Sequence, residues 1–186
     1  ARAPNKCLSE KYPKTKQAEY SANLLLDIYN LQKDYISLEK VGAELLANES
    51  IASSKAGSDI RGVLEKASFK RGQDLETEKK YKESADQFQI FAKQNPTSNL
   101  AVVALFNAAV NFERAGLYAP AVQNYTAVLA SNKPEAENLK PKARRLIAKL
   151  NQDAGLFEEA ARMYKMAAQE NKKDPLVPNY LFNAAV

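Results

Sequence analysis

The side chains that stand out first for their chemistry are the basic ones of the segment KPKARRLIAK, residues 140–149. Lys142, Arg145 and Lys149 follow one another at spacings of three and four residues, which places them on one face of a helix. A row of cations like this suits an acidic peptide or an anionic polymer. A solvated helix face has the same composition, so the sequence leaves both interpretations open.

Catalytic and metal chemistry is poorly represented in the rest of the chain. The sequence has no histidine and a single cysteine, Cys7. This composition excludes histidine-based acid–base catalysis, Ser-His and Cys-His nucleophile pairs, and the usual zinc ligand sets. Neighbouring carboxylates such as Glu158 and Glu159 point in different directions on a helix and indicate surface charge. We therefore expect no enzyme activity, no cofactor and no metal site in this region.

The composition bounds the fold class and the partner class. The chain has 186 residues, of which 45% are hydrophobic and 26% are charged, so it is long enough to bury one core or a short repeat array. Few glycines and prolines favour an all-α protein. The net charge of +5 is modest, and both signs alternate, so no nucleic acid is expected as a partner. No apolar run has the length of a transmembrane segment.

An internal repeat organises the chain from residue 80 onward. An aromatic residue marks the start of each second helix, and another aromatic follows seven residues later: Tyr81 and Phe88, Tyr118 and Tyr125, Phe157 and Tyr164. The pentapeptide FNAAV occurs at both 106–110 and 182–186, and equivalent positions lie 37 or 39 residues apart. A period of this length predicts helical hairpins that stack on one another.

Proline and glycine divide the chain into the elements of this repeat. Pro96 ends one predicted helix, and Gly116 and Gly155 end two others. We expect a basic N-terminal arm at residues 1–16 and a single helical repeat domain at residues 17–186. Within that domain the pattern predicts a degenerate hairpin at 17–50, a loop at 51–60, repeats at about 61–97, 98–134 and 135–175, and a terminal helix at 176–186.

These units resemble the tetratricopeptide repeat (TPR) family, which places one small residue in the first helix of each pair and another in the second. The small residues here are Gly72, Ala109, Ala148 and Ala185 in first helices, and Ser84, Ala121 and Ala160 in second helices. The resemblance implies an all-α fold, a right-handed superhelix of antiparallel helix pairs. In such an α-solenoid the first helices line a concave groove.

The run from Tyr81 to Val122, with its turn Pro96-Thr97-Ser98, is similar to TPR proteins of the bacterial cell envelope. The resemblance implies a periplasmic or envelope-associated protein, and a cytoplasmic protein is the alternative. It also implies a non-catalytic scaffold that binds a protein, peptide or partner segment in the groove. The family's carboxylate clamp is matched at too few positions to be expected.

The repeat register directs a defined set of side chains toward the expected groove. They are Phe69, Gln73, Glu76, Phe106, Asn107, Val110, Glu113, Lys142, Arg145, Lys149 and Gln152. Packing between hairpins is an equally open interpretation for Phe69 and Phe106. A capping or inter-helix hydrogen bond is equally open for Asn107 and its repeat-equivalent Asn183.

Two other functions remain open from the sequence. The first is an architectural segment that stacks end to end within a larger complex or with the remainder of a longer chain, because a repeat array needs a polar cap where stacking stops. The second, less favoured, is binding of nucleic acid or an anionic polymer through residues 140–149. Strong salt dependence of binding would distinguish this second function.

Overall fold

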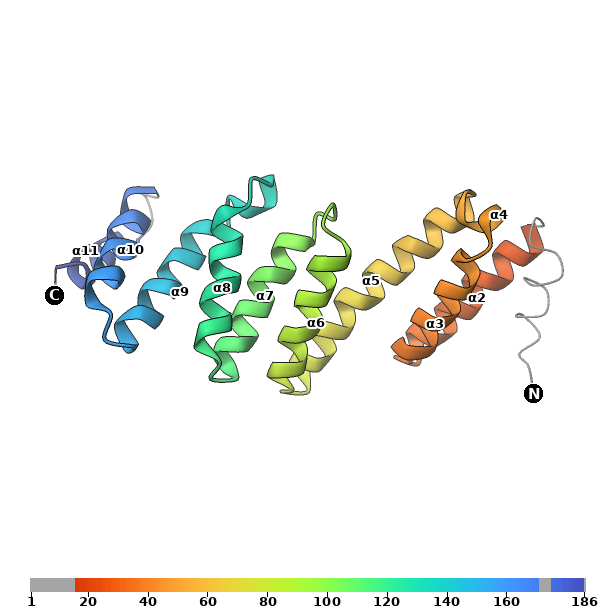
Figure 1. Cartoon of the computed structure of the whole chain (residues 1–186), viewed down its shortest axis with the longest axis horizontal. Helices are drawn as coiled ribbons and strands as arrows, with labels where there is room; N and C mark the ends of the chain where they lie inside the picture. The colour runs from red at the N-terminus through yellow and green to blue at the C-terminus, as the bar shows by residue number, and fades with distance from the viewer. Residues whose placement is uncertain (1–15, 171–174, 186) are drawn as a thin grey trace. The chain divides into compact units, whose positions relative to one another are not determined.

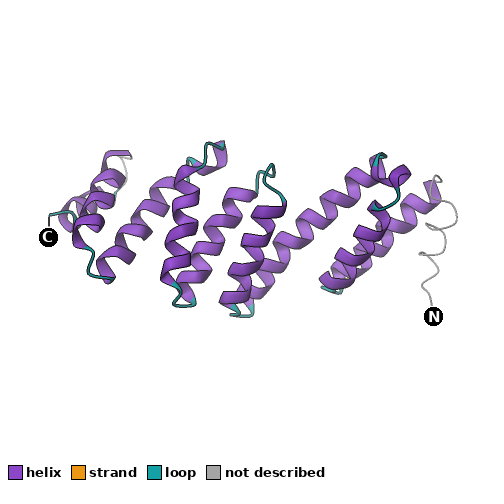
Figure 2. Cartoon of the chain, in the orientation of Figure 1, coloured by secondary structure: helices purple, strands orange, loops and turns teal. Residues whose placement is uncertain are grey.

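The computed structural model describes residues 16–170 and 175–185. The described residues are 80% helical and contain no strand (Figure 2). This confirms the prediction of an all-α protein. The predicted basic arm lies outside the described residues, apart from Lys16.

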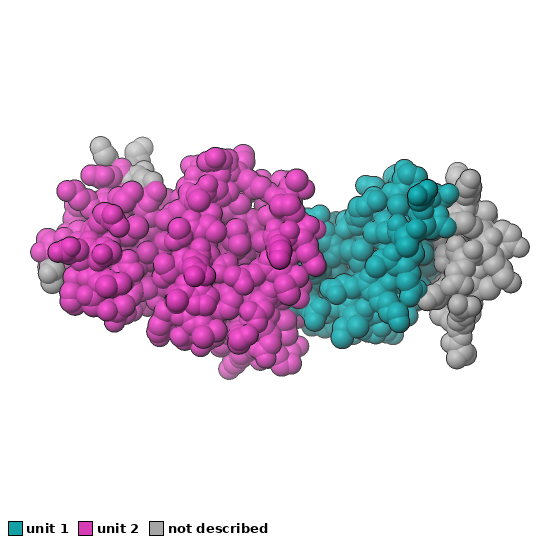
Figure 3. All heavy atoms as spheres, viewed as in Figure 1, with its two compact units in different colours: residues 1–73 teal, residues 74–186 magenta. Residues whose placement is uncertain are grey.

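Figure 1 shows a succession of helices joined by short connections. In the described ranges they are α2 (Lys16–Leu31), α3 (Tyr35–Leu46), α4 (Glu49–Ala52), α5 (Lys55–Thr77), α6 (Tyr81–Gln94), α7 (Ala101–Arg114), α8 (Tyr118–Ala130), the 3-10 helix η1 (Pro134–Ala136), α9 (Lys140–Asp153), α10 (Phe157–Glu170) and α11 (Val177–Asn183). The chain forms two compact units, unit 1 (residues 1–73) and unit 2 (residues 74–186), and the boundary falls within α5 (Figure 3).

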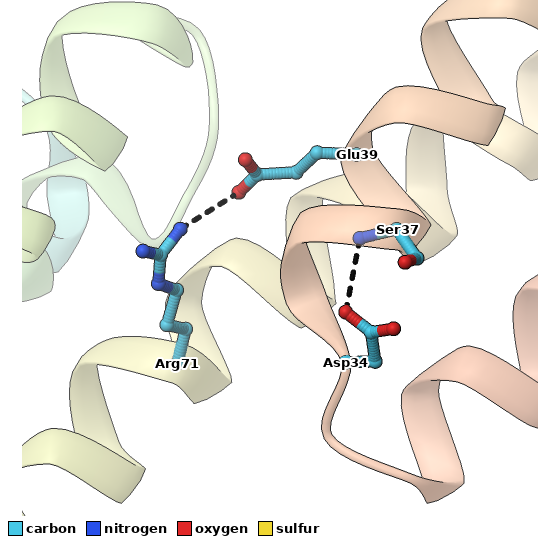
Figure 4. Close-up of polar contacts among 4 residues, drawn as sticks. All are labelled: Asp34, Ser37, Glu39 and Arg71. Atoms are coloured by element: carbon cyan, nitrogen blue, oxygen red, sulfur yellow. Dashed lines mark hydrogen bonds and ion pairs between the residues drawn. The ribbon is translucent and has the colours of Figure 1, made fainter.

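In unit 1, α2 and α3 form the hairpin predicted at residues 17–50. Asp34 caps α3, because its side-chain oxygen accepts a hydrogen bond of 3.1 Å from the backbone N–H of Ser37 (Figure 4). Hydrogen bonding to Ser37 lowers the pKa of Asp34. On α5, Arg71 Nη1 lies 3.5 Å from Glu39 Oε1 of α3 (Figure 4). These contacts fix the turn between the first two helices and connect α3 to α5.

The prediction of a loop at residues 51–60 is wrong for most of this segment, because nearly all of its residues belong to α4 or α5. Its small polar residues suggested a loop, but Ile51 and Ile60 are buried in the core of unit 1. The hydroxyl of Ser54 accepts a 3.3 Å hydrogen bond from the backbone N–H of Gly57 in the first turn of α5. Burial of the two isoleucines and this capping interaction stabilise the helix.

In unit 2, each helix from α6 to α11 packs against the next one along the chain. Most small residues of the repeat in unit 2 are buried: Ser84, Ala121 and Ala160 in second helices, and Ala109 and Ala148 in first helices. Ala185, predicted to take the same place in the last first helix, is exposed and lies beyond the end of α11. Short side chains let neighbouring helices approach closely, while the aromatic residues Phe88, Phe91 and Tyr125 fill the remaining core.

Two predicted helix ends in unit 2 are confirmed by the backbone. Gly116 follows α7 with φ of 74°, and Gly155 follows α9 with φ of 77°. This left-handed conformation is the usual way in which a glycine ends a helix. Pro141 and Pro178 lie in the first two positions of α9 and α11, where a missing N–H donor costs nothing. First and second helices therefore alternate as the sequence pattern indicates.

Candidate functional site

The predicted groove residues are shared between the two units. Phe69 and Gln73 belong to α5 in unit 1, and the other nine lie in unit 2. The side chain of Phe69 is only 9% exposed, so it is part of the core and offers little surface to a partner. Gln73 is exposed. The site is therefore built from the residues of unit 2.

Two first helices of unit 2, α7 and α9, are connected through their polar side chains. Lys149 Nζ of α9 lies 3.9 Å from Glu113 Oε1 of α7, and the two side chains are 59% and 22% exposed. Residues three, four or seven positions from Glu113 on α7, and from Lys149 on α9, lie on the same helix face as these two residues. We call this the α7–α9 surface, which comprises Phe106, Val110, Glu113, Lys142, Arg145, Lys149 and Gln152.

Two polar residues of this surface are positioned by buried tyrosines of the second helices. The hydroxyl of Tyr125 donates a 3.1 Å hydrogen bond to Glu113 Oε2. The hydroxyl of Tyr164 donates one of the same length to Gln152 Oε1. Both tyrosine rings are almost completely buried, so they hold the acceptor side chains in defined orientations at the edge of the core.

The pKa values of the two tyrosine hydroxyls are raised, so both hydroxyls stay protonated to a higher pH than an exposed tyrosine does. Burial raises the pKa of Tyr125 far above its ordinary value, and the nearby Glu113 carboxylate raises it further. Burial also raises the pKa of Tyr164, and a hydrogen bond with Asn183 opposes this effect. A neutral hydroxyl is the form that can donate to Glu113 or Gln152.

The predicted site residue Glu76 is engaged in an interaction that sequence reasoning missed. It forms an ion pair with Arg114, which lies one repeat further along the chain. The Arg114 guanidinium also lies over the ring of Tyr81, with 5.6 Å between Cζ and the ring centroid. The signal that could have revealed this contact is the separation of 38 residues between the two charged residues, because it matches the repeat period.

Two further predicted residues, Phe106 and Asn107, take part in internal contacts. The ring of Phe106 meets that of Tyr125 edge to face, with 5.5 Å between centroids and 63° between planes. The side chain of Phe106 is nevertheless partly exposed, so packing and surface contact are both compatible with its position. The backbone carbonyl of Asn107 accepts a 2.9 Å hydrogen bond from the side-chain amide of Asn111, which is fully buried.

The basic segment does not form a uniformly positive patch. Lys142 is exposed, Arg145 is partly exposed, and Lys149 lies near the carboxylate of Glu113. Lys140 Nζ pairs with Glu137 Oε1 at 2.8 Å. Because acidic residues neutralise part of the charge, this face resembles a mixed protein surface more than a phosphate-binding track.

A cavity of about 220 Å³ opens beside the α7–α9 surface, between α9, α10 and α11. The described residues that line it are Gln152, Phe157, Ala160 and Asn183. Ala160 is buried, while the ring of Phe157 is 65% exposed. The cavity therefore combines an aromatic ring with two side-chain amides, and only Gln152 among the four belonged to the predicted groove set.

Two other kinds of site are absent from the described ranges. None of the helices there is both long enough and apolar enough to cross a membrane. No group of three or more His, Cys, Asp or Glu side chains in residues 16–170 and 175–185 could hold a metal ion. The α7–α9 surface, the ion pairs and the cavity lined by Gln152 and Phe157 are thus features of unit 2 that can support a function.

No protein-family model matches the chain, and no curated protein matches it. The TPR resemblance therefore stays a prediction from the residues themselves.

Proposed function

We propose that this chain is a non-catalytic protein-interaction scaffold whose α7–α9 surface binds a peptide or a segment of a partner protein. The observation that carries the proposal is the approach of Lys149 to Glu113, because it joins the first helices of successive repeats into one surface. The proposal includes a TPR-like α-solenoid with these first helices on the concave side. The buried small residues at equivalent positions support it.

The chemistry of the surface favours a peptide over a polyanion. Its described side chains alternate between the partly exposed apolar groups of Phe106 and Val110, the exposed cation of Lys142 and the carboxylate of Glu113. A polyanion would leave Glu113 and the apolar groups unmatched, whereas a peptide can match each group with a different side chain. An envelope-associated location, with the cytoplasm as the alternative, belongs to the same proposal.

A charge-reversal capture experiment tests the surface. Lys142→Glu with Lys149→Glu changes two exposed cations on α9, and Lys93→Glu with Lys165→Glu makes the same charge change on the second helices α6 and α10. Both double variants and the unchanged protein would be immobilised and used to capture partners from extracts of the source organism. We expect the first variant to lose a partner that the control retains.

Photo-crosslinking from position 142 would then identify the segment of the partner that lies on the surface. Equal capture by both double variants would contradict the proposal, provided that circular dichroism shows unchanged helicity. A partner lost by both variants would indicate attraction by net charge alone, which also contradicts a localised surface.

Exposed apolar side chains favour a second candidate function, an architectural segment that stacks against other repeats. Phe157, Leu181 and Phe182 on α10 and α11 are 65%, 51% and 69% exposed. Exposed large apolar side chains, such as the neighbouring Leu181 and Phe182 of α11, can form interaction sites. Light scattering at increasing concentration tests this candidate: we expect self-association that Phe182→Ser weakens, and a monomer at all concentrations would reject it.

A further inference from the structure

The cations of α9 differ in whether the protein itself neutralises them. They are Lys140, Lys142, Arg144, Arg145 and Lys149. Lys140 pairs with Glu137 at 2.8 Å, and Lys149 lies 3.9 Å from Glu113. Arg144 is partly buried, and burial lowers its pKa. Lys142 and Arg145 form no ion pair with a carboxylate of the described residues, so their charges are available to a ligand.

Lys142 and Arg145 are placed so that one anion can contact both. They lie three residues apart on α9, which puts them on one face, about 4.5 Å apart along the helix axis. Lys142 is exposed, and Arg145 is partly exposed. Arginine offers a planar fork that matches a carboxylate, while lysine adds a mobile ammonium group. Because the neighbouring cations are already paired or partly buried, these two suit a single carboxylate better than a long polyanion.

The carboxylates of α9 and of the connector before it leave this charge in place. Glu137 is already paired with Lys140. Glu135 of η1 is a single carboxylate against two cations. Asp153 lies eight residues after Arg145, which is about 12 Å further along the helix. Among the described residues, the start of α9 thus keeps a net positive charge.

Helix α10 distributes its charges in the same direction. It packs against α9 and follows it after a short turn, so the first turn of α10 lies near the end of α9. That first turn contains Glu158 and Glu159, whereas Arg162 and Lys165 come later in the helix. The acidic groups of this part of the hairpin therefore gather at the end of α9, away from Lys142.

Apolar side chains of α7 adjoin the two cations. Phe106 precedes Arg145 by 39 residues, which is one step of the repeat, so the two occupy equivalent levels of α7 and α9. The approach of Lys149 to Glu113 places these two helices side by side. Phe106 and Val110 are partly exposed. An apolar group of a ligand can therefore pack beside an anion that is bound to Arg145.

We propose that this part of the α7–α9 surface binds an acidic side chain of the peptide partner together with an apolar residue next to it, an inference that rests on the proposed scaffold function. The carboxylate would contact Lys142 and Arg145, and the apolar side chain would pack on Phe106. Each half of the ligand then meets a group of matching chemistry. Lys149 is a less favourable contact for the carboxylate, because Glu113 already neutralises its ammonium group.

Lys142 occupies a position where a cation opposes the helix. It is the third residue of α9, after Lys140 and Pro141, and the first turn contains no acidic residue. The N-terminal end of a helix carries a partial positive charge, so cations there destabilise it. A bound carboxylate relieves this repulsion. Lys142→Gln should therefore raise the urea midpoint of the free protein and weaken binding of the acidic ligand. A variant unchanged in both measurements would show that Lys142 is only a solvated side chain.

The test uses the peptide N-acetyl-Gly-Leu-Glu-Leu-Gly-amide as the probe, and the same peptide with glutamine in place of glutamate as the uncharged control. Each is titrated into the 15N-labelled protein while the backbone amides of residues 142–145 and the Nε–H of Arg145 are followed by NMR. We expect saturable shifts with the glutamate probe and an affinity about threefold lower or less for the control. Equal affinity for both peptides, or shifts confined to other residues, would overturn the proposal.

A third peptide, in which glycines replace both leucines, tests the apolar part of the ligand. It should bind more weakly than the glutamate probe, because it has no side chain to pack on Phe106. If the two peptides bind equally, the surface is a general anion site of the kind that a polyanion uses, and the proposed ligand is wrong.

Substitutions identify the cations that contact the carboxylate. Lys142→Gln and Arg145→Gln should each weaken binding of the glutamate probe about threefold, as the loss of an exposed ion pair does. Lys149→Gln should weaken it less, because Glu113 already neutralises Lys149. Lys165→Gln on α10 is the matched control for net charge and should leave the affinity unchanged. Equal losses from Lys142→Gln and Lys165→Gln would show attraction by net charge alone and would overturn the proposal.

Failure of this ligand and failure of the scaffold function have different signatures. If the glutamate probe does not bind while Lys142→Glu with Lys149→Glu still loses a captured partner, only the acidic ligand is rejected. If the probe binds but no captured partner depends on those two lysines, only the scaffold function is rejected.

Discussion

The hydroxyl of Tyr164 donates a 3.1 Å hydrogen bond to Gln152, and in the preceding repeat Tyr125 donates one of equal length to Glu113. In both cases the acceptor lies twelve residues before the tyrosine. The same internal hydrogen bond therefore recurs with a neutral acceptor in one repeat and a charged one in the other. The next earlier repeat has Phe88 at the tyrosine position, which shows that the ring alone is compatible with the packing.

Replacing each tyrosine by phenylalanine should show that the two hydrogen bonds contribute different amounts to the free energy of unfolding. Tyr125→Phe leaves the Glu113 carboxylate without its donor and should lower the free energy of unfolding by about 2 kcal/mol. Tyr164→Phe removes a bond to a neutral amide and should cost about 1 kcal/mol. Urea unfolding curves measure both values, and a larger loss from Tyr164→Phe would contradict the ranking.

The raised pKa of Tyr125 predicts a loss of stability in alkali. Its pKa is higher in the folded than in the unfolded chain, chiefly because of burial and then because of the Glu113 carboxylate. Below pH about 10 both states are protonated and the stabilisation is complete. Above that pH the unfolded tyrosine loses its proton first, so the free energy of unfolding should fall by up to about 1.4 kcal/mol per pH unit.

Tyr125→Phe provides the control for this alkaline transition, because it retains every other tyrosine and lysine. The difference in unfolding free energy between the protein and the variant should shrink as the pH rises from about 9 to about 11. A difference that stays constant over this interval would show that Tyr125 titrates normally in the folded chain.

Much of the fold of unit 2 could be predicted from local signals. Gly116 and Gly155 end their helices in the left-handed conformation, and the small residues at repeated positions are buried, except Ala185. These features depend on backbone geometry and on the repeat period, and both can be predicted from residue types and their spacing in the sequence. The predicted loop at 51–60 failed because its helical state depends on the burial of Ile51 and Ile60, which local composition does not reveal.

The candidate site was less predictable than the fold. Helical spacing assigned Phe69 to the groove, but spacing does not say which apolar face of a helix is covered, and Phe69 is buried. Arg114 was missed because its partner Glu76 lies 38 residues away. Contacts of this kind follow from the stacking of repeats, so the repeat period can indicate them, whereas the helical spacing within one segment cannot.

Replacing two glycines of α5 by alanine should have opposite effects on stability. One of them, Gly57, lies in the first turns of this helix, which the sequence predicted as a loop. A Cβ at Gly57 would lie 2.3 Å from the backbone oxygen of Ile51, whereas a Cβ at Gly62 would meet nothing within 4 Å. Gly57→Ala should lower the free energy of unfolding by about 3 kcal/mol, because backbone atoms must move. Gly62→Ala should raise it by about 0.5–1 kcal/mol, because alanine is the better helix former.

Thermal unfolding of these two alanine variants measures both effects with the same substitution in one helix. If Gly57→Ala were as stable as Gly62→Ala, α4 and α5 would have to lie further apart than they do here. The pair thus checks the helical start of α5 independently of the isoleucine burial.

The interaction of Arg114 with Glu76 and Tyr81 can be divided by a double-mutant cycle. The Glu76 and Arg114 side chains are 31% and 48% exposed, so Glu76→Gln and Arg114→Met should show a coupling energy of only about 0.5–1 kcal/mol. Raising the salt concentration to about 1 M should reduce this coupling, because exposed ion pairs are screened.

Tyr81→Leu should remove a further contribution of about 0.5 kcal/mol that depends on the stacked ring. Chemical unfolding of the single and double variants at low and high salt provides the measurement. A coupling that does not change with salt, or a Tyr81 effect that persists in the Arg114→Met background, would show that Glu76 and Tyr81 do not hold the guanidinium by charge and stacking.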